Sequence, residues 1–187
     1  MAKNYRFLLG CIALCLHLCV TNALGAAISH EDQTREALAT LFEAKVGVME
    51  KGYNAGPEVE AFQRSSGNHR GEAWCASFVT WCFKMVGLPV PRNSGAAAAW
   101  FPRTKVIYRS GESLLGRNPK KADLAGFSYG NGIHHIGFIQ VWSDDFVITV
   151  EGNTGGGHRV NREGDGVHRM RRLKSQITLV SCWIPES

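Results

Sequence analysis

Apolar residues recur near the start of the chain at the three- and four-residue spacing of an amphipathic helix. Ser29 followed by Asp32 indicates a capping box at the beginning of this segment. The pattern predicts a first helix from about His30 to Lys51. Its apolar face is formed by Leu38, Leu41, Phe42, Val46 and Met49.

Two further helices are predicted before the pattern changes. Pro57 follows a break rich in Gly and Asn, and its fixed φ suits the first turn of a short helix that ends near Ser65. Gly87 stops the next helix, which carries a dense apolar stripe. We expect this third helix to begin near Glu72 or Ala73 and to run through Phe83 to Val86.

After Pro91 the chain consists of short runs rich in β-branched and aromatic residues, separated by turn residues. The polar connection 143–145 joins two of these runs tightly, which indicates antiparallel pairing. Helices followed by antiparallel strands are typical of the α+β class, so we expect N-terminal helices packed on an antiparallel β-sheet. The predicted strands are Val106–Arg109, Leu124–Tyr129, His135–Trp142, Phe146–Glu151, Val167–Leu173 and Ile177–Trp183.

The N-terminus has the composition of a cleavable signal peptide. Lys3 and Arg6 precede an apolar run over residues 7–20, and small residues follow around position 25. The run is shorter than the roughly 18 residues that a membrane-spanning helix needs. The segment ending at Cys11 looks like a lipid-attachment box, but the apolar stretch follows it instead of preceding it.

We therefore expect residues 1–25 to be a signal peptide and residues 28–187 to form one domain, with the mature chain starting between Ala26 and Ile28. The protein should be secreted or periplasmic, monomeric and without a stable membrane anchor. Removal of Lys3 and Arg6 from the 21 basic residues leaves 19 against 16 acidic ones, a formal charge of +3. We interpret the basic stretch 159–174 as a solvated edge, and expect no nucleic-acid partner.

Cysteine usage changes once the leader is removed, because only Cys75, Cys82 and Cys182 remain. An odd number in an exported chain leaves at least one thiol unpaired. A bridge between Cys82 and Cys182 would leave Cys75 as the free thiol. The favoured alternative is that both stay reduced, as small buried hydrophobic residues.

The candidate chemistry combines a cysteine on a helix with a histidine on a strand. Cys75 falls in the first turn of the third helix, where unpaired N–H groups and the helix dipole stabilise a thiolate. His134 and His135 open a strand on which adjacent side chains point to opposite faces, so one alone can face the helix. That imidazole takes the proton of the thiol. Glu151 or Asn153, at the end of the next strand, can then hydrogen-bond its second ring nitrogen.

Three motifs in this order resemble the CHAP domain, the cysteine, histidine-dependent amidohydrolase/peptidase, in its compact form common in Bacteroidota and phages. They are Trp-Cys-Ala-Ser-Phe-Val-Thr-Trp-Cys over 74–82, His-Ile-Gly-Phe over 135–138 and Glu-Gly-Asn over 151–153. The resemblance covers essentially the whole mature chain. It implies a papain-like fold and hydrolysis of amide bonds in peptidoglycan, as an endopeptidase or N-acetylmuramoyl-L-alanine amidase, with no cofactor. It also implies that Cys75 is the nucleophile, His135 the base, Glu151 the orienting acid and Asn153 a further polar site residue.

Other functions are compatible with parts of the pattern. A metal hydrolase could use His134 and His135 with Asp123 or Glu151, but neighbouring strand residues diverge and the usual ligand spacings are missing from the sequence, so we expect no metal. A transferase would use the same thioester with an amine acceptor, and a wall-binding module would have the fold without activity. The backbone N–H of Cys75 is the natural first oxyanion donor, whereas the sequence does not identify the second.

Overall fold

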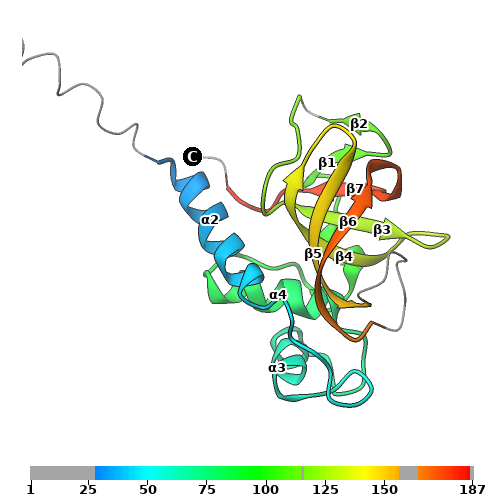
Figure 1. Ribbon diagram of the computed structural model, residues 1–187. Coiled ribbons are helices and arrows are strands. Elements are labelled where there is room, and N and C mark those ends of the chain that lie inside the picture. The colour runs from blue at the N-terminus through cyan, green and yellow to red at the C-terminus, as the bar shows by residue number, and fades with distance from the viewer. Residues whose placement is uncertain (1–27, 115, 156–163, 186–187) are drawn as a thin grey trace, which may run out of the picture.

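The computed structural model of the protein describes residues 28–114, 116–155 and 164–185 (Figure 1). The predicted signal peptide, residues 1–25, lies outside the described residues. Within the described ranges no helix has the length and apolar character needed to cross a membrane. The helices come first along the chain: α2 (His30–Glu43), α3 (Pro57–Ser66), α4 (Cys75–Met85) and the short 3-10 helix η1 (Ala97–Trp100).

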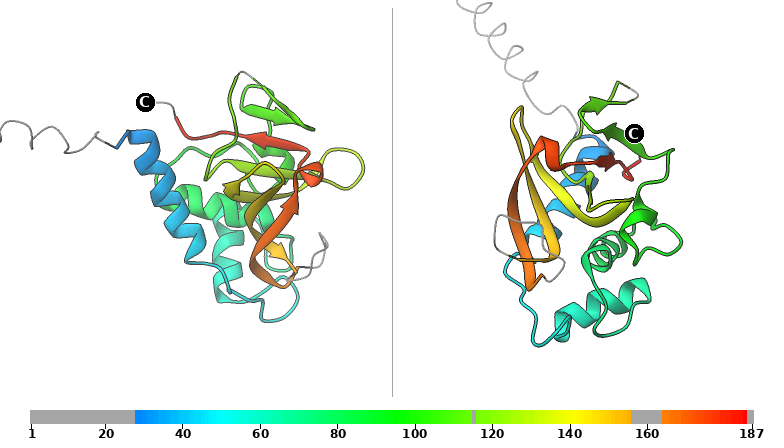
Figure 2. Two further views of the ribbon diagram at one scale, coloured as in Figure 1. Left: turned by 45° about the horizontal axis from the view of Figure 1, so that its top comes forward. Right: turned by 90° about the vertical axis from the view of Figure 1, so that its right-hand side faces the viewer.

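The strands follow and form one antiparallel sheet in the described part of the chain, in the order β2-β1-β7-β3-β4-β5-β6. Figures 1 and 2 show the helices gathered on one side of this sheet. The α+β class that we predicted, with N-terminal helices on an antiparallel sheet, is therefore confirmed. The strands are β1 (Val106–Arg109), β2 (Glu112–Ser113), β3 (Leu124–Ser128), β4 (Ile133–Trp142), β5 (Phe146–Thr154), β6 (Gly166–Leu173) and β7 (Leu179–Ser181), with the 3-10 helix η2 (Lys174–Gln176) before β7.

The sheet is strongly curled. The rings of Tyr108 on β1 and Trp142 on β4 meet edge to face at 4.9 Å, although β7 and β3 lie between these strands in the sheet order. Strands of L-residues twist, and the twist accumulates across a sheet of several strands. The curl brings side chains from distant strands into one compact core.

The first helix ends at Glu43, so our prediction that it continues to Lys51 is wrong. Gly47 has a φ of 92°, which a helix cannot accommodate, and its N–H donates to the carbonyl of Val167 on β6. The chain then forms an isolated bridge between Met49 and Gly166. Pairing with the sheet replaces the last helical turns, and it carries Glu50 toward the start of α4.

Helix α4 packs tightly on the sheet. Phe78 of α4 meets Phe138 of β4 edge to face at 5.8 Å, and both side chains are fully buried. A Cβ on Gly152 of β5 would lie 2.8 Å from the Trp74 ring and 2.9 Å from Cβ of Phe78, so only glycine allows this approach. The helix and β5 are thereby held close enough for side chains at the start of α4 to meet those of the sheet.

Helix α4 begins at Cys75, slightly later than the start near Glu72 or Ala73 that we predicted. The remaining differences concern strand ends. β5 continues to Thr154, so Asn153 belongs to the strand and does not follow it. The last strand begins at Leu179, and not at Ile177, because η2 occupies residues 174–176. The two-residue strand β2 and the short helix η1 are additions that the hydrophobic pattern did not predict.

Candidate active site

Cys75 is the first residue of α4, with 8% of its surface exposed. The residue before it is Trp74, an indole in place of the Ser, Thr, Asp or Asn that usually caps a first turn. The N–H groups of a first helical turn have no partner within the helix, and the helix dipole is positive there. This location favours a negatively charged sulfur on Cys75.

His135 lies near the start of β4 and is 3% exposed, whereas the adjacent His134 is exposed and stacks on the ring of Tyr129. The prediction that the two histidines point in different directions is confirmed. The Nε2 atom of His135 lies 2.9 Å from Oε2 of Glu151. The side chain of Cys75 also acts on the imidazole and raises its pKa. Since Nε2 is taken by the carboxylate, Nδ1 is the ring nitrogen that faces the thiol.

The surroundings of His135 stabilise its protonated form. Burial by itself lowers the pKa of this histidine, but the hydrogen bond and charge attraction of Cys75, followed by those of Glu151, outweigh burial. The pKa of His135 is raised from its usual 6.5 to about 9. His135 is therefore set up to hold its proton at neutral pH.

Glu151 is fully buried and accepts hydrogen bonds on both carboxylate oxygens. Burial raises the pKa of Glu151, but the bonds and charges of Arg172 and His135 dominate and lower it to about 2. The carboxylate is thus ionised throughout the neutral range. Its donors besides His135 are Thr149 Oγ1 to Oε1 at 2.5 Å, Arg172 Nε to Oε1 at 2.9 Å and an Arg172 terminal nitrogen to Oε2 at 2.5 Å.

Arg172 contradicts our interpretation of residues 159–174 as a solvated basic edge. Its side chain is 0% exposed, while its neighbours Arg171 and Leu173 are exposed. The alternation along β6 turns every second residue inward, and Met170 shares the inward side. The carboxylate of Glu151 compensates the buried charge.

Asn153 does not contact His135. Of the two partners that we considered for the second ring nitrogen, Glu151 is the one that the structure brings there. The Oδ1 atom of Asn153 instead accepts the backbone N–H of Trp74 at 3.1 Å, and its Nδ2 donates to Asn54 at 3.0 Å and to Glu50 at 3.3 Å. Asn153 therefore holds the residue that precedes Cys75.

Glu50 completes this contact from the segment after α2. Its Oε1 accepts the indole N–H of Trp74 at 2.8 Å, and its Oε2 accepts the backbone N–H of Asn54 at 2.8 Å. Both the backbone and the side chain of Trp74 are thus fixed by polar partners. The start of α4 is tied to β5 and to the loop before α3 at the position where the nucleophile candidate begins the helix.

The other two cysteines among the described residues, Cys82 and Cys182, form no disulfide and are buried. Burial raises the pKa of the Cys82 thiol well above its usual value, against a smaller opposing charge from Lys45. Burial, reinforced by Asp123, also raises the pKa of Cys182, although Arg35 opposes the shift. Neither thiol is set up to react near neutral pH.

Asp123 does not contribute to a metal site with the histidines. It is 1% exposed and binds Arg35 of α2, with Nη1 to Oδ1 at 2.9 Å. Across the described ranges no group of three or more His, Cys, Asp or Glu side chains has the arrangement of a metal site.

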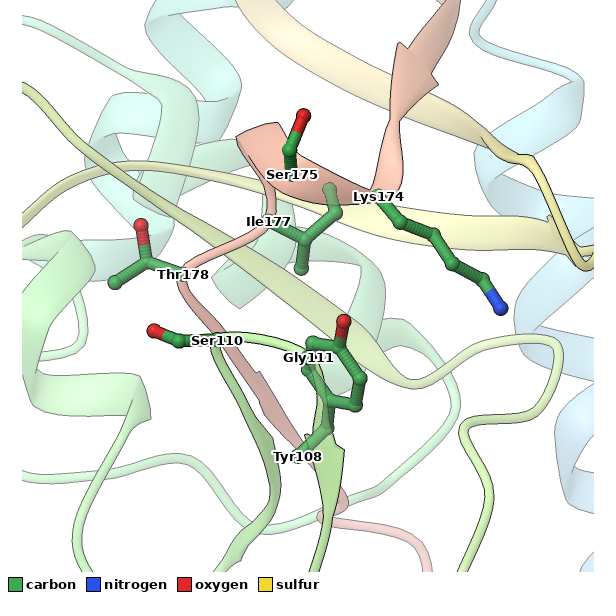
Figure 3. A pocket seen from close by; sticks show the side chains of 7 residues that line it. All are labelled: Tyr108, Ser110, Gly111, Lys174, Ser175, Ile177 and Thr178. Atoms are coloured by element: carbon green, nitrogen blue, oxygen red, sulfur yellow. The ribbon is translucent and has the colours of Figure 1, made fainter.

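A cavity of about 480 Å³ opens elsewhere, between β1 and η2 (Figure 3). Tyr108 lies in its wall and contacts Trp142, the last residue of β4. At 3.3 Å per residue, Trp142 lies about 23 Å along the strand from His135. The cavity is therefore separate from the candidate active site. Its lining consists of Tyr108, Ser110, Gly111, Lys174, Ser175, Ile177 and Thr178.

Comparison with protein families gives a match between residues 66–153 and the CHAP domain. The matched segment contains all four predicted site residues, Cys75, His135, Glu151 and Asn153. Residues 66–153 belong to the CHAP family. This family comprises cysteine- and histidine-dependent amidohydrolases of the peptidoglycan-hydrolase type.

Among solved structures, the P60 domain from an M. avium paratuberculosis antigen aligns with the CHAP chain at a TM-score of 0.44 and 14% identity. The alignment covers 81% of this chain and 93% of that domain. No curated protein matches the chain.

Sequence reasoning missed three residues that support the site: Glu50, Thr149 and Arg172. Glu50 was placed in a helix that ends before it, and Thr149 carries no motif of its own. The sequence does contain a signal for Arg172. Side chains alternate between the two faces of a strand, so Arg172 lies on the same inward face as Met170. An inward arginine requires a buried anion, and Glu151 was the available candidate.

Proposed function

We propose that this CHAP protein is a peptidoglycan hydrolase that cleaves an amide bond of the wall peptide through a thioester on Cys75. The observation that supports this most directly is the buried unit of Cys75, His135 and Glu151 at the start of α4. Family membership supports the same reaction class.

In the first half of the reaction, the Cys75 sulfur attacks the carbonyl carbon of the scissile amide. The developing oxyanion is stabilised by N–H groups in the first turn of α4, beginning with that of Cys75 itself. The C–N bond then breaks, and protonated His135 gives its Nδ1 proton to the departing amine. The acyl group remains on Cys75 as a thioester.

In the second half, water attacks the thioester carbon while neutral His135 accepts one of its protons. The C–S bond breaks, the product carboxylic acid leaves, and the thiolate–imidazolium pair forms again. Glu151 remains ionised in both halves. It fixes the ring through Nε2 and offsets the positive charge whenever the imidazole is protonated.

The substrate is an extracellular polymer, so the proposal includes export. We propose that residues 1–25 direct the chain out of the cytoplasm and are removed, which leaves a secreted or periplasmic enzyme. Two amide types in peptidoglycan fit the chemistry equally: the sugar–peptide junction, cut by an amidase, and a bond within the peptide, cut by an endopeptidase.

The deciding experiment is digestion of purified peptidoglycan by residues 28–187, with mass spectrometry of the soluble products. We expect new amine and carboxylate ends in equal amounts, and their position identifies the bond. Cys75→Ala should release no products while it keeps the wild-type circular dichroism spectrum. Cys82→Ala, in the same helix but away from the site, is the matched control and should retain activity.

Each other result contradicts the proposal in a distinct way. Acyl transfer to an added amine in place of water would identify a transferase. Binding to the wall without products would identify an inactive module. Normal digestion by folded Cys75→Ala would exclude the cysteine mechanism.

A further inference from the structure

We propose that Arg172 is a positioning residue of the active site, which holds the Glu151 carboxylate in the one orientation that supports His135. The proposal rests on the cysteine mechanism described above. Arg172 lies on β6, outside the residues 66–153 that match the CHAP family.

The contact between Arg172 and Glu151 is a two-point contact. Nε of Arg172 donates to Oε1 at 2.9 Å and a terminal nitrogen donates to Oε2 at 2.5 Å, so the carboxylate plane is fixed by the guanidinium plane. Oε2 then has its remaining acceptor direction toward Nε2 of His135 at 2.9 Å. A single-point cation would contact one oxygen and would not by itself fix the plane of the carboxylate.

The guanidinium itself has little freedom. Its side chain is 0% exposed, and its central carbon lies 5.3 Å from the centre of the Phe127 ring. The same ring packs against the imidazole of His135 at 5.5 Å. Phe127 therefore holds Arg172 and His135 in a fixed relation from the side of β3, while Glu151 links them directly.

The groups that face Glu151 come from each neighbouring strand: His135 from β4, Thr149 from its own strand β5 and Arg172 from β6. From α4, Cys75 acts on the carboxylate only through His135. Arg172 is the permanent cation of this group, because histidine loses its proton during catalysis. Without Arg172, a fully buried carboxylate would favour its protonated form and support for the imidazolium would weaken.

The test measures alkylation of Cys75 by iodoacetamide between pH 4 and pH 9, a reaction that needs no wall substrate. In the wild type we expect reactivity to persist at low pH, as a thiolate–imidazolium pair requires. In Arg172→Met the pH at which reactivity falls to half should rise by about one unit or more. Arg172→Lys keeps the charge without the two-point contact, so its half-point should lie between those of the wild type and Arg172→Met.

Arg171→Met is the matched control, since Arg171 is the next residue on β6 and is exposed. It should show the wild-type profile. Alkylation of Cys75→Ala gives the background from Cys82 and Cys182, which are buried. Circular dichroism and thermal unfolding monitor folding in each variant.

Every outcome decides the proposal. If folded Arg172→Met and Arg172→Lys lose thermal stability but keep the wild-type pH profile, Arg172 has only a structural role and the proposal is overturned. If Arg172→Met does not fold, the profile of Arg172→Lys decides alone, an upward shift supporting the proposal and an unchanged profile overturning it. If wild-type Cys75 is itself unreactive at all pH values, the cysteine mechanism fails, which is a separate result.

Discussion

At the scale of single residues, the site depends on two opposite pKa shifts. Glu151 is fully buried yet keeps its charge, because donors from Arg172, Thr149 and His135 replace the water that it has lost. His135 is buried yet favours its charged form, because the influence of Cys75 and Glu151 outweighs burial. Charges of opposite sign therefore follow one another from His135 through Glu151 to Arg172.

Substitution of each residue should lower activity in proportion to its part in proton transfer. His135→Ala removes the general acid and base, so we expect a loss of wall hydrolysis of at least about 10²- to 10⁴-fold, approaching the complete loss expected of Cys75→Ala. Glu151→Gln keeps the imidazole but loses the charge behind it, and should lose about 100-fold, or ~2.7 kcal/mol in barrier height. Initial rates of peptidoglycan solubilisation provide the measurement.

His134→Ala is the control for this series, because His134 is exposed and points away from the site. We expect its rate to be close to that of the wild type. Loss of activity in His134→Ala together with normal activity in His135→Ala would require the two roles to be exchanged.

At the scale of secondary-structure elements, two irregularities flank the site. The pairing of β3 with β4 shifts register between Phe127 and Ser128, next to His135, and the pairing of β5 with β6 shifts between Glu151 and Thr154. Such irregularities turn individual side chains away from the regular alternation. Asn153 lies within the second one with a φ of 51°, a left-handed conformation that Asn tolerates better than most residues.

Asn153 should position α4 and not take part in proton transfer. Asn153→Ala removes the acceptor for the Trp74 N–H and places alanine in a left-handed conformation, which costs about 1–2 kcal/mol. We expect slower alkylation of Cys75 and a lower free energy of unfolding, measured in urea. Asn153→Gly lacks the side chain but tolerates the backbone conformation, so it should slow alkylation equally with a smaller loss of stability. Wild-type alkylation in both variants would show that the Trp74 contact does not position the nucleophile.

Much of this arrangement could be predicted from local patterns. The place of Cys75 in the first turn of α4, the inward direction of His135 and the antiparallel pairing of β4 with β5 follow from helix signals, strand alternation and a short connection. Glu151 was predicted as the orienting acid, but a strand-end glutamate by itself does not indicate complete burial.

The contact of Glu50 with Trp74 could not be predicted in the same way, and for Arg172 strand alternation predicts the inward direction but not the neighbouring strand that brings it to Glu151. Glu50 reaches Trp74 because the chain leaves α2 early to pair with β6, a tertiary contact that overrides the helical pattern. Arg172 lies opposite Val147 in the pairing and reaches Glu151 along the strand. Both depend on how strands are placed next to each other, which single-chain periodicity does not contain.

At the scale of the whole molecule, the site lies between the two parts of the fold. Cys75 comes from the helical part, and His135 and Glu151 come from the sheet. The ionic contacts of the site join β4, β5 and β6, and their titration should influence the stability of the folded chain. Activity and stability should depend on some of the same protonation states.

The sign of this dependence follows from the direction of each shift. Glu151 has its pKa lowered from 4.5 to about 2, so its contribution is complete above pH 4.5 and is lost as the pH falls toward 2. His135 has its pKa raised from 6.5 to about 9, so its contribution is complete below pH 6.5 and is lost as the pH rises toward 9. Both contributions are complete only between about pH 4.5 and pH 6.5.

We therefore expect the free energy of unfolding, measured in urea at a series of pH values, to decline between pH 6.5 and pH 9 by a few kcal/mol attributable to His135. Subtracting the curve of His135→Ala isolates that contribution, because alanine does not titrate. The His134→Ala curve should keep the same decline, since that exposed side chain is not part of the ionic contacts. If His135→Ala declines as steeply as the wild type over this range, the folded protein does not hold the proton on His135, and neutral thiol and imidazole would be the resting state of the site.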